Sequence, residues 1–120
     1  MITLYLAGPM RGYHLYNSVA FKLETAKLRS RGYQVISPQE MDEQDGVDFS
    51  SDETIKATVK KDRQGEPDED YYLNRDFLAI HSADGLALME GWEKSIGVAR
   101  EIATALEADK RIRLIKFWKE

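Results

Sequence analysis

The chain begins with an apolar run that stops abruptly at a glycine and a proline. Residues 2–7, ITLYLA, have the length and composition of a strand that is buried on both faces. The segment 19–31 follows with apolar side chains at helical spacing, and Gly32 stands where such a helix would end. A second short strand-like run occupies 33–36. This β-α-β order predicts two parallel strands joined by a right-handed crossover.

The rest of the chain continues to alternate helix and strand. Helical spacing returns over 70–82 and after Ser95, and strand-like apolar runs lie at 85–89 and 112–115. We therefore predict an α/β fold, a flavodoxin-like or Rossmann-like three-layer domain with four to five parallel strands. A chain of 120 residues without internal repeats suits a single domain, 1–120.

One segment departs from this alternation. Residues 41–69 carry many charged side chains and few large apolar ones, so we predict a long polar excursion, mobile in part, with a short helix near 52–59. A loop of this length in a compact domain is usually either disordered or a lid over a site. The composition does not separate these two interpretations.

The composition also excludes several kinds of chemistry. The chain has no cysteine, which excludes disulfides, a cysteine nucleophile and thiolate metal sites, and its two histidines are too few for a metal cluster. The formal net charge of -4 argues against binding to nucleic acid polymers. No apolar run reaches the roughly 20 residues of a membrane span, and no basic leader precedes the first strand. We expect a cytoplasmic protein with no metal and no membrane partner.

Ligands of parallel sheets bind beyond the carboxyl ends of the strands, where three loops of this chain should converge. These loops are residues 8–12, 37–40 and 90–97. In the first loop, Arg11 lies between Gly8 and Gly12, a setting that favours contact with a phosphate or a carboxylate. The structural alternative is a surface charge in a turn.

The third loop leads into a predicted helix. Ser95 and Gly97 lie at its start, where exposed N–H groups favour an anion, and Glu101 follows nearly two turns later. In the structural alternative, Ser95 is only an N-cap and Glu101 is a solvated helix residue.

Two aspartates add candidate carboxylates. Asp76 lies within the 70–82 helix and Asp84 lies directly before a buried strand. A pair of carboxylates suits chemistry at a glycosidic bond, with one as nucleophile and one managing the proton. The alternatives are an ion pair of Asp76 with Arg75 or Lys94, and a turn or cap for Asp84.

Aromatic side chains lie next to the same loops. They can line a pocket or stack on a base or a sugar, and the alternative is ordinary packing. These residues are Tyr5, Tyr13, Tyr16 and Trp92.

Three stretches together resemble the nucleoside 2-deoxyribosyltransferase superfamily. They are YLAGPMRG at 5–12, Asp76 followed by Ala83-Asp84, and Ser95-x-Gly97-x-x-x-Glu101, in the order of that family. The Gly-x-x-Arg-Gly pattern is similar to that of the 2′-deoxynucleoside 5′-monophosphate N-glycosidases. The loop 91–95 resembles that of small phage and bacterial members, which implies a bacterial or phage origin.

The resemblance implies an enzyme that cleaves or exchanges the N-glycosidic bond of a (deoxy)ribonucleoside 5′-monophosphate. In this interpretation Glu101 is the nucleophile at C1′, and Asp76 assists protonation of the leaving base. No metal or organic cofactor is implied, and relatives form homodimers or larger homo-oligomers. The predicted substrate-binding residues are Tyr5, Gly8, Arg11, Gly12, Asp84, Trp92, Ser95 and Gly97.

Two departures from the family keep other interpretations open. Arg100 precedes Glu101 where relatives often carry an aromatic or small residue, so it can either pair with Glu101 or point away. The segment 41–69 is also unlike that of the glycosidases. The alternatives to an enzyme are a protein that binds a nucleotide or nucleotide-derived signal without turnover, and an interaction protein that uses 41–69.

Overall fold

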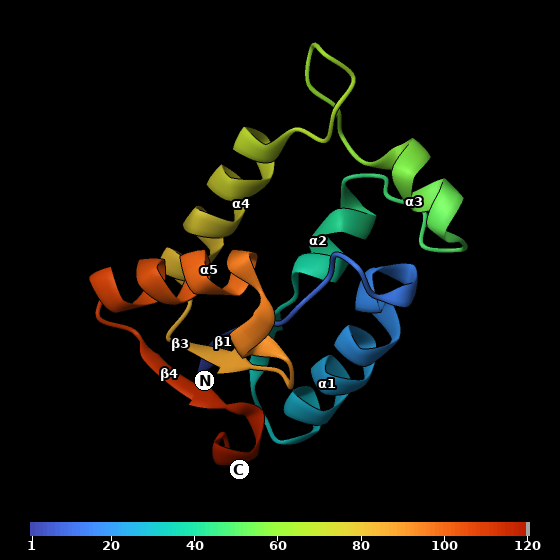
Figure 1. Ribbon diagram of the computed structural model, residues 1–120. Coiled ribbons are helices and arrows are strands. Elements are labelled where there is room, and N and C mark those ends of the chain that lie inside the picture. Colours follow the sequence, from blue (N-terminus) through green and yellow to red (C-terminus); the bar gives the residue numbers. More distant parts are fainter. Residues whose placement is uncertain (120) are drawn as a thin grey trace.

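The computed structural model describes residues 1–119 and is built on one four-stranded sheet (Figure 1). The strands are β1 (Thr3–Ala7), β2 (Gln34–Ile36), β3 (Gly85–Leu88) and β4 (Arg111–Leu114). Their order in the sheet is β2-β1-β3-β4, and every pairing is parallel. The predicted α/β fold is confirmed, with four strands.

Helices cover both faces of the sheet (Figure 1). They are α1 (Ser18–Ser30), α2 (Pro38–Gln44), α3 (Asp52–Thr58), α4 (Glu69–Ser82) and α5 (Ile96–Glu107), with short 3-10 helices η1 (His14–Asn17), η2 (Trp92–Lys94) and η3 (Ile115–Phe117). In the described part of the chain, no helix is both long enough and apolar enough to cross a membrane.

Alternate residues of β1 face opposite layers, as the pleat of a strand requires. Leu4 and Leu6 pack in the cluster that contains Phe21 of α1. Tyr5 and Ala7 pack in a second cluster, with side chains from α4 and α5. Tyr5 thus enters the layer in which α4 and α5 carry their carboxylates.

The loop predicted at 37–40 is wrong, because α2 begins there. Ser37 Oγ accepts a hydrogen bond from the N–H of Glu40, and Pro38 occupies the first turn. Proline suits that position because its missing N–H has no partner inside the helix. Serine and proline signal a helix start here, whereas we predicted a loop.

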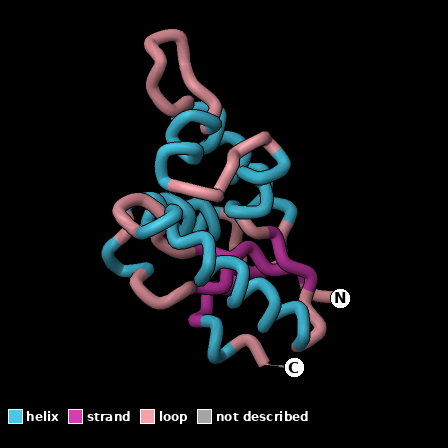
Figure 2. The backbone as a smooth tube through the Cα atoms, turned by 90° about the vertical axis from the view of Figure 1, so that its right-hand side faces the viewer, coloured by secondary structure: helices cyan, strands magenta, loops and turns pink. Residues whose placement is uncertain are grey.

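The segment 41–69 is more regular than the polar excursion we predicted. It contains most of α2 and the whole of α3, whose place agrees with the expected helix near 52–59. Val47 and Ile55 are buried and anchor this region. The connection 59–68 projects away from the sheet, as Figures 1 and 2 show from two directions.

The turn before α1 has an unusual backbone. Leu15, Tyr16 and Asn17 have φ values of 50°, 53° and 62°, in the left-handed region that side chains disfavour. The N–H of Leu15 donates to Asp52 Oδ1 at 2.8 Å, and Asn17 Nδ2 donates to the carbonyl of Pro9 at 2.9 Å. These bonds hold η1 against the start of α3, beside the carboxyl edge of the sheet.

Candidate active site

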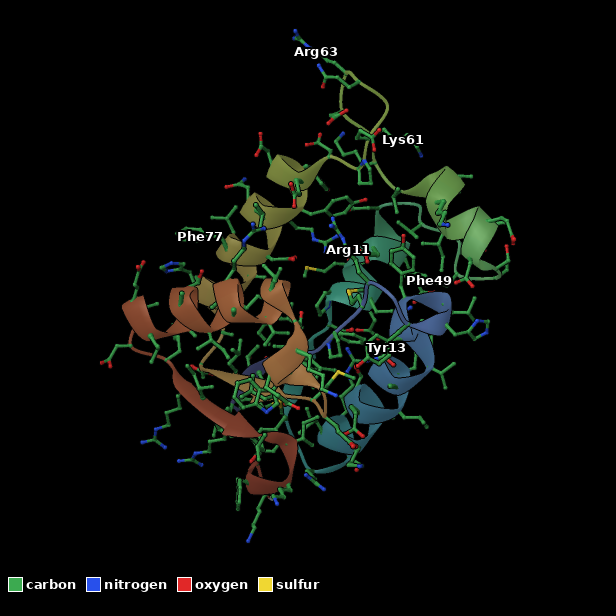
Figure 3. The ribbon with its side chains drawn as sticks, viewed as in Figure 1. Arg11, Tyr13, Phe49, Lys61, Arg63 and Phe77 are labelled. Carbon is green, nitrogen blue, oxygen red and sulfur yellow. The ribbon has the colours of Figure 1, made fainter. Side chains whose placement is uncertain are left out.

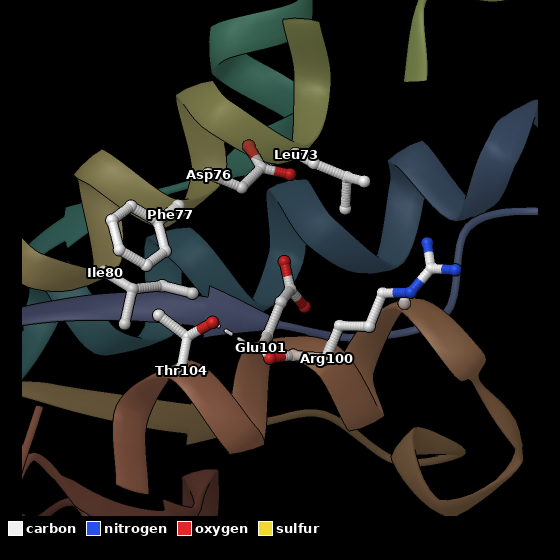
Figure 4. Close-up of a pocket in the computed structure, with 8 residues that line it drawn as sticks. Leu73, Asp76, Phe77, Ile80, Arg100, Glu101 and Thr104 are labelled. Carbon is white, nitrogen blue, oxygen red and sulfur yellow. Dashed lines mark hydrogen bonds between the residues drawn. The ribbon is translucent and has the colours of Figure 1, made fainter. Parts of the chain in front are cut away.

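A cavity of about 520 Å³ lies at the carboxyl edge of the sheet. Its walls come from the loop after β1, from α2 and α3, from α4 and from the start of α5. A smaller hollow of about 200 Å³ lies between α4 and α5 (Figure 4). The two spaces share Leu73, Asp76, Gly97, Arg100 and Glu101. Both candidate catalytic carboxylates therefore lie where the two spaces meet.

Glu101 projects from α5 toward Asp76 on α4 (Figure 4). The hydroxyl of the fully buried Tyr5 donates a hydrogen bond to Glu101 Oε2 at 2.5 Å. Burial raises the pKa of Glu101 to about 8, although the Tyr5 hydrogen bond opposes this rise by favouring the carboxylate. At neutral pH, Glu101 is therefore mainly the neutral acid.

Asp76 combines both roles that we considered for it. Its Oδ1 accepts a hydrogen bond from Arg75 Nε at 3.1 Å and lies 3.0 Å from Arg75 Nη2, so the ion pair that we considered exists. The same side chain lines the cavity. Burial raises the pKa of Asp76, and the positive charge of Arg75 lowers it again in part.

The guanidinium of Arg75 also reaches Asp42 in α2 and Asp45, the residue that follows the last residue of α2. Its Nη1 lies 2.8 Å from Asp42 Oδ1 and 3.1 Å from Asp45 Oδ2. Burial raises the pKa of Asp42 to about 6 despite this ion pair. Asp42 lines the cavity and was missed in the sequence, because α2 itself was missed and nothing else placed residue 42 beside the site.

The start of α5 supplies the polar end of the cavity. Ser95 and Gly97 line it, and Ser95 Oγ also accepts from the N–H of Val98 at 3.2 Å, so Ser95 is an N-cap as well. Arg11 and Lys94 line the same space. The lining of this cavity thus combines a helix N-terminus with two cations, which favours an anion.

Arg100 does not pair with Glu101. Its Nη1 lies 3.7 Å from Oε1 of Glu69, and its side chain extends away from Glu101 in Figure 4. The carboxylate of Glu101 therefore remains directed into the shared space.

For three other residues of the predicted site, the structure shows a role in the backbone or in packing. A Cβ on Gly8 would lie 2.6 Å from Met89 Sδ, so glycine permits the close approach of the chain there, although Gly8 also lines the cavity. Gly12 has a φ of +82° and occupies a turn outside the cavity lining. Trp92 packs against the core cluster of Tyr5 instead of lining the cavity.

Asp84 lies at the other end of the sheet from the cavity. Its Oδ2 accepts from the backbone N–H of Thr3 at 2.8 Å, and its own N–H donates to the Thr3 carbonyl. Both contacts are at the amino ends of β1 and β3. The structure does not bring Asp84 to the carboxylates, and the turn alternative describes its position.

The wall opposite α5 is apolar and aromatic. Tyr13 and Tyr16 line it, as considered from the sequence, and Phe49 joins them (Figure 3). Phe49 was missed because it lies in the segment that we took as a polar excursion. Within residues 1–119, no group of three histidine, aspartate or glutamate side chains is placed to hold a metal ion.

Comparison with known proteins places this fold in a class. The solved structure of the 2-deoxyribosyltransferase from the psychrotolerant bacterium Bacillus psychrosaccharolyticus aligns with a TM-score of 0.57 and 21% identity. The alignment covers 93% of this chain and 70% of that chain. The chain thus has a 2-deoxyribosyltransferase-like fold, and the resemblance predicted from its motifs is confirmed at the level of fold.

The family follows from the sequence comparison. The family described as "Domain of unknown function (DUF4406)" matches residues 2–114, so the chain belongs to it. A comparison with curated protein sequences finds no match.

Proposed function

We propose that this protein cleaves or exchanges the N-glycosidic bond of a (deoxy)ribonucleoside 5′-monophosphate, with Glu101 as the nucleophile at C1′. The observation that carries the proposal is the position of the Glu101 carboxyl group. It is hydrogen-bonded to Tyr5, directed toward Asp76 and open to the cavity. The 2-deoxyribosyltransferase-like fold supports the same class of reaction.

The reaction proceeds in two displacements at C1′. In the first, the bond from C1′ to the base nitrogen breaks, and its electron pair leaves with the base, which takes a proton. A carboxylate oxygen of Glu101 forms a bond to C1′ as positive charge develops on the sugar. In the second, water or another base attacks C1′, loses a proton and displaces the carboxylate.

The two carboxyl groups need different protonation states. Glu101 must be ionised to attack, and the Tyr5 hydrogen bond favours that form. Asp76 is the candidate donor of the proton to the leaving base, and burial raises its pKa in the direction that suits an acid. The rate should therefore depend on pH through both groups: ionisation of Glu101, whose pKa is about 8, increases the rate, and ionisation of Asp76 decreases it.

The 5′-phosphate is assigned to the polar end of the cavity. Arg11 and Lys94 supply positive charge, and Ser95 and the N–H groups near Gly97 supply hydrogen bonds. Contacts far from C1′ hold the sugar in a reactive orientation, which contributes several kcal/mol to catalysis, on the order of 7 in favourable cases.

The resemblance supports four further parts of this proposal. The chain 1–120 acts as one domain, and it forms a homodimer or a larger homo-oligomer. It functions in a bacterial cytoplasm, encoded by the bacterium or by a phage. Its reaction needs no metal or organic cofactor.

Chromatography of free base tests the proposal directly. A panel of ribo- and deoxyribonucleoside 5′-monophosphates is incubated with the wild type, with Glu101→Gln and with the matched control Glu107→Gln, whose side chain is exposed at the end of the same helix. Wild type and control should release base, and Glu101→Gln should be slower by about 10³-fold or more. Equal release by Glu101→Gln would show that the activity does not use this carboxylate.

A binding protein without turnover is the second candidate. The high pKa of Glu101 favours it, because a neutral acid can donate a hydrogen bond to a bound nucleotide but cannot attack C1′. A nucleotide that raises the melting temperature and is recovered intact would support this candidate. It would also contradict the enzymatic proposal.

A further inference from the structure

Arg75 stands where α2 and α4 meet. One side of its guanidinium faces α2, where Nη1 contacts Asp42 at 2.8 Å and Asp45 at 3.1 Å. The other side faces Asp76, whose Oδ1 lies within hydrogen-bond distance of both Nε and Nη2. All three guanidinium nitrogens are engaged with carboxylates, and the side chain is only 14% exposed. Its planar fork is therefore held from two helices at once.

Two tyrosines contact this guanidinium or one of its carboxylate partners. It lies over the ring of Tyr72, 5.0 Å from the centroid. The Tyr71 hydroxyl donates to Asp45 Oδ2 at 2.8 Å, so this carboxylate is fixed from a second side. Asp45 lies outside the cavity lining and anchors Arg75 from behind, whereas Asp42 and Asp76 both line the cavity.

Arg75 balances the negative charge of the carboxylates beside it. One positive group faces three carboxylates, and two of these carboxylates have side chains that are only 15% and 21% exposed. Without the guanidinium, Asp42 and Asp76 would be like charges close together in poorly hydrated surroundings, which is costly. They would separate or take up protons.

We propose that Arg75 is the positioning residue of the acidic wall: it ties α2 to α4 and holds the carboxylates of Asp42 and Asp76 at the cavity, with Asp76 turned toward Glu101. The expected effect of Arg75 on turnover rests on the proposed function. The arrangement of the carboxylates does not depend on that function and can be measured without a substrate.

The charges around Arg75 give the proposal a directional test. The groups that face it are Asp42 from α2, Asp45 directly after α2, Tyr71, Tyr72 and Asp76 from α4, Tyr5 from β1, and Glu101 from α5. Arg75 lowers the pKa of Asp42, Asp76 and Glu101. Asp45 instead raises the pKa of Asp42 and Asp76. Neutralising Arg75 and neutralising Asp45 must therefore move the pKa of Asp76 in opposite directions.

Titration of ¹³C-labelled carboxyl groups by NMR on the full chain provides the measurement. Arg75→Gln should raise the pKa of Asp76 by about one unit or more, because it removes an opposite charge in direct contact. Asp45→Asn should lower it. The matched control is Arg29→Gln, which removes another bidentate contact to α2, the one to Glu40, at an exposed site that does not line the cavity. The control should leave the titration unchanged.

Arg75→Lys separates charge from geometry. Lysine retains the positive charge but cannot bridge Asp76 and α2 with a planar fork. The pKa of Asp76 should stay nearer the wild-type value than in Arg75→Gln. In base release, kcat should still fall by about tenfold or more while KM for the nucleotide changes little, because the phosphate is assigned to Arg11, Lys94 and Ser95 and not to Arg75.

Each outcome decides the proposal. Wild-type titration of Asp76 in both Arg75→Gln and Arg75→Lys would overturn it, as would equal effects of Arg29→Gln. If Arg75→Gln does not fold, Arg75→Lys and Asp45→Asn carry the test alone. If the titrations follow the expectation and the wild type releases no base, the proposed function fails while the positioning role of Arg75 stands.

Discussion

Glu101→Gln should stabilise the folded protein at alkaline pH. The pKa of Glu101 is about 8 in the folded chain, against a usual value of 4.5 for glutamate. The folded state therefore binds this proton more tightly than the unfolded state does. The resulting stabilisation is complete below pH 4.5 and is lost as the pH rises through about 8.

The difference between these two pKa values sets the magnitude. At about 1.36 kcal/mol per pKa unit, ionisation of Glu101 costs the folded state at most about 5 kcal/mol. Glutamine has nearly the same shape and can still accept the hydrogen bond from Tyr5 through its amide oxygen. The substitution therefore removes the cost of ionisation without creating a cavity.

Urea unfolding across the pH range measures this effect. The free energies of unfolding of Glu101→Gln and wild type should be similar at about pH 4.5, and the variant should be more stable by up to about 5 kcal/mol at about pH 9. Glu107→Gln, an exposed position on the same helix, should follow the wild type throughout. Parallel curves for Glu101→Gln and wild type would refute the reasoning, because Glu101 would then titrate alike in the folded and unfolded states.

Three further substitutions probe the same site. Tyr5→Phe removes the hydrogen bond that lowers the pKa of Glu101, so the pH of half-maximal kcat/KM for base release should move upward. Gly8→Ala places a Cβ 2.6 Å from Met89 Sδ and 2.9 Å from Met89 Cβ, and urea unfolding should show a loss of about 1–3 kcal/mol. Ser95→Ala removes the cap on α5 and should cost about 1 kcal/mol in the same assay.

The sheet and its long helices were predictable because their residues follow regular periods. Residues 4–7 of β1 and all of β3 are buried, and burial on both faces leaves a near-continuous apolar run that is visible in the sequence. Ser95 marks the start of α5 through its capping side chain. Glu101 and Asp76 could be placed at one edge because parallel strands bring the helices after them to the same side.

The helix α2 could not be predicted from periodicity. Its sequence, PQEMDEQ, has one large apolar residue, so no apolar face repeats. Missing this helix also hid the contacts of Asp42 and Asp45 with Arg75, which join positions more than 25 residues apart. The position of Asp84, in contrast, could have been predicted. A residue directly before a parallel strand lies at the amino end of the sheet, and this rule outweighs the motif that led us to include it.

The most direct test of the account is the mass of the protein during turnover. Wild-type protein and a nucleotide from which it releases base are mixed, quenched in acid and analysed by intact and peptide mass spectrometry. The account predicts a mass increase of one sugar phosphate on the peptide that contains Glu101, and no increase in Glu101→Gln. Base release with no adduct at any time of quenching, or with an adduct on another residue, would contradict the role of Glu101 as the nucleophile.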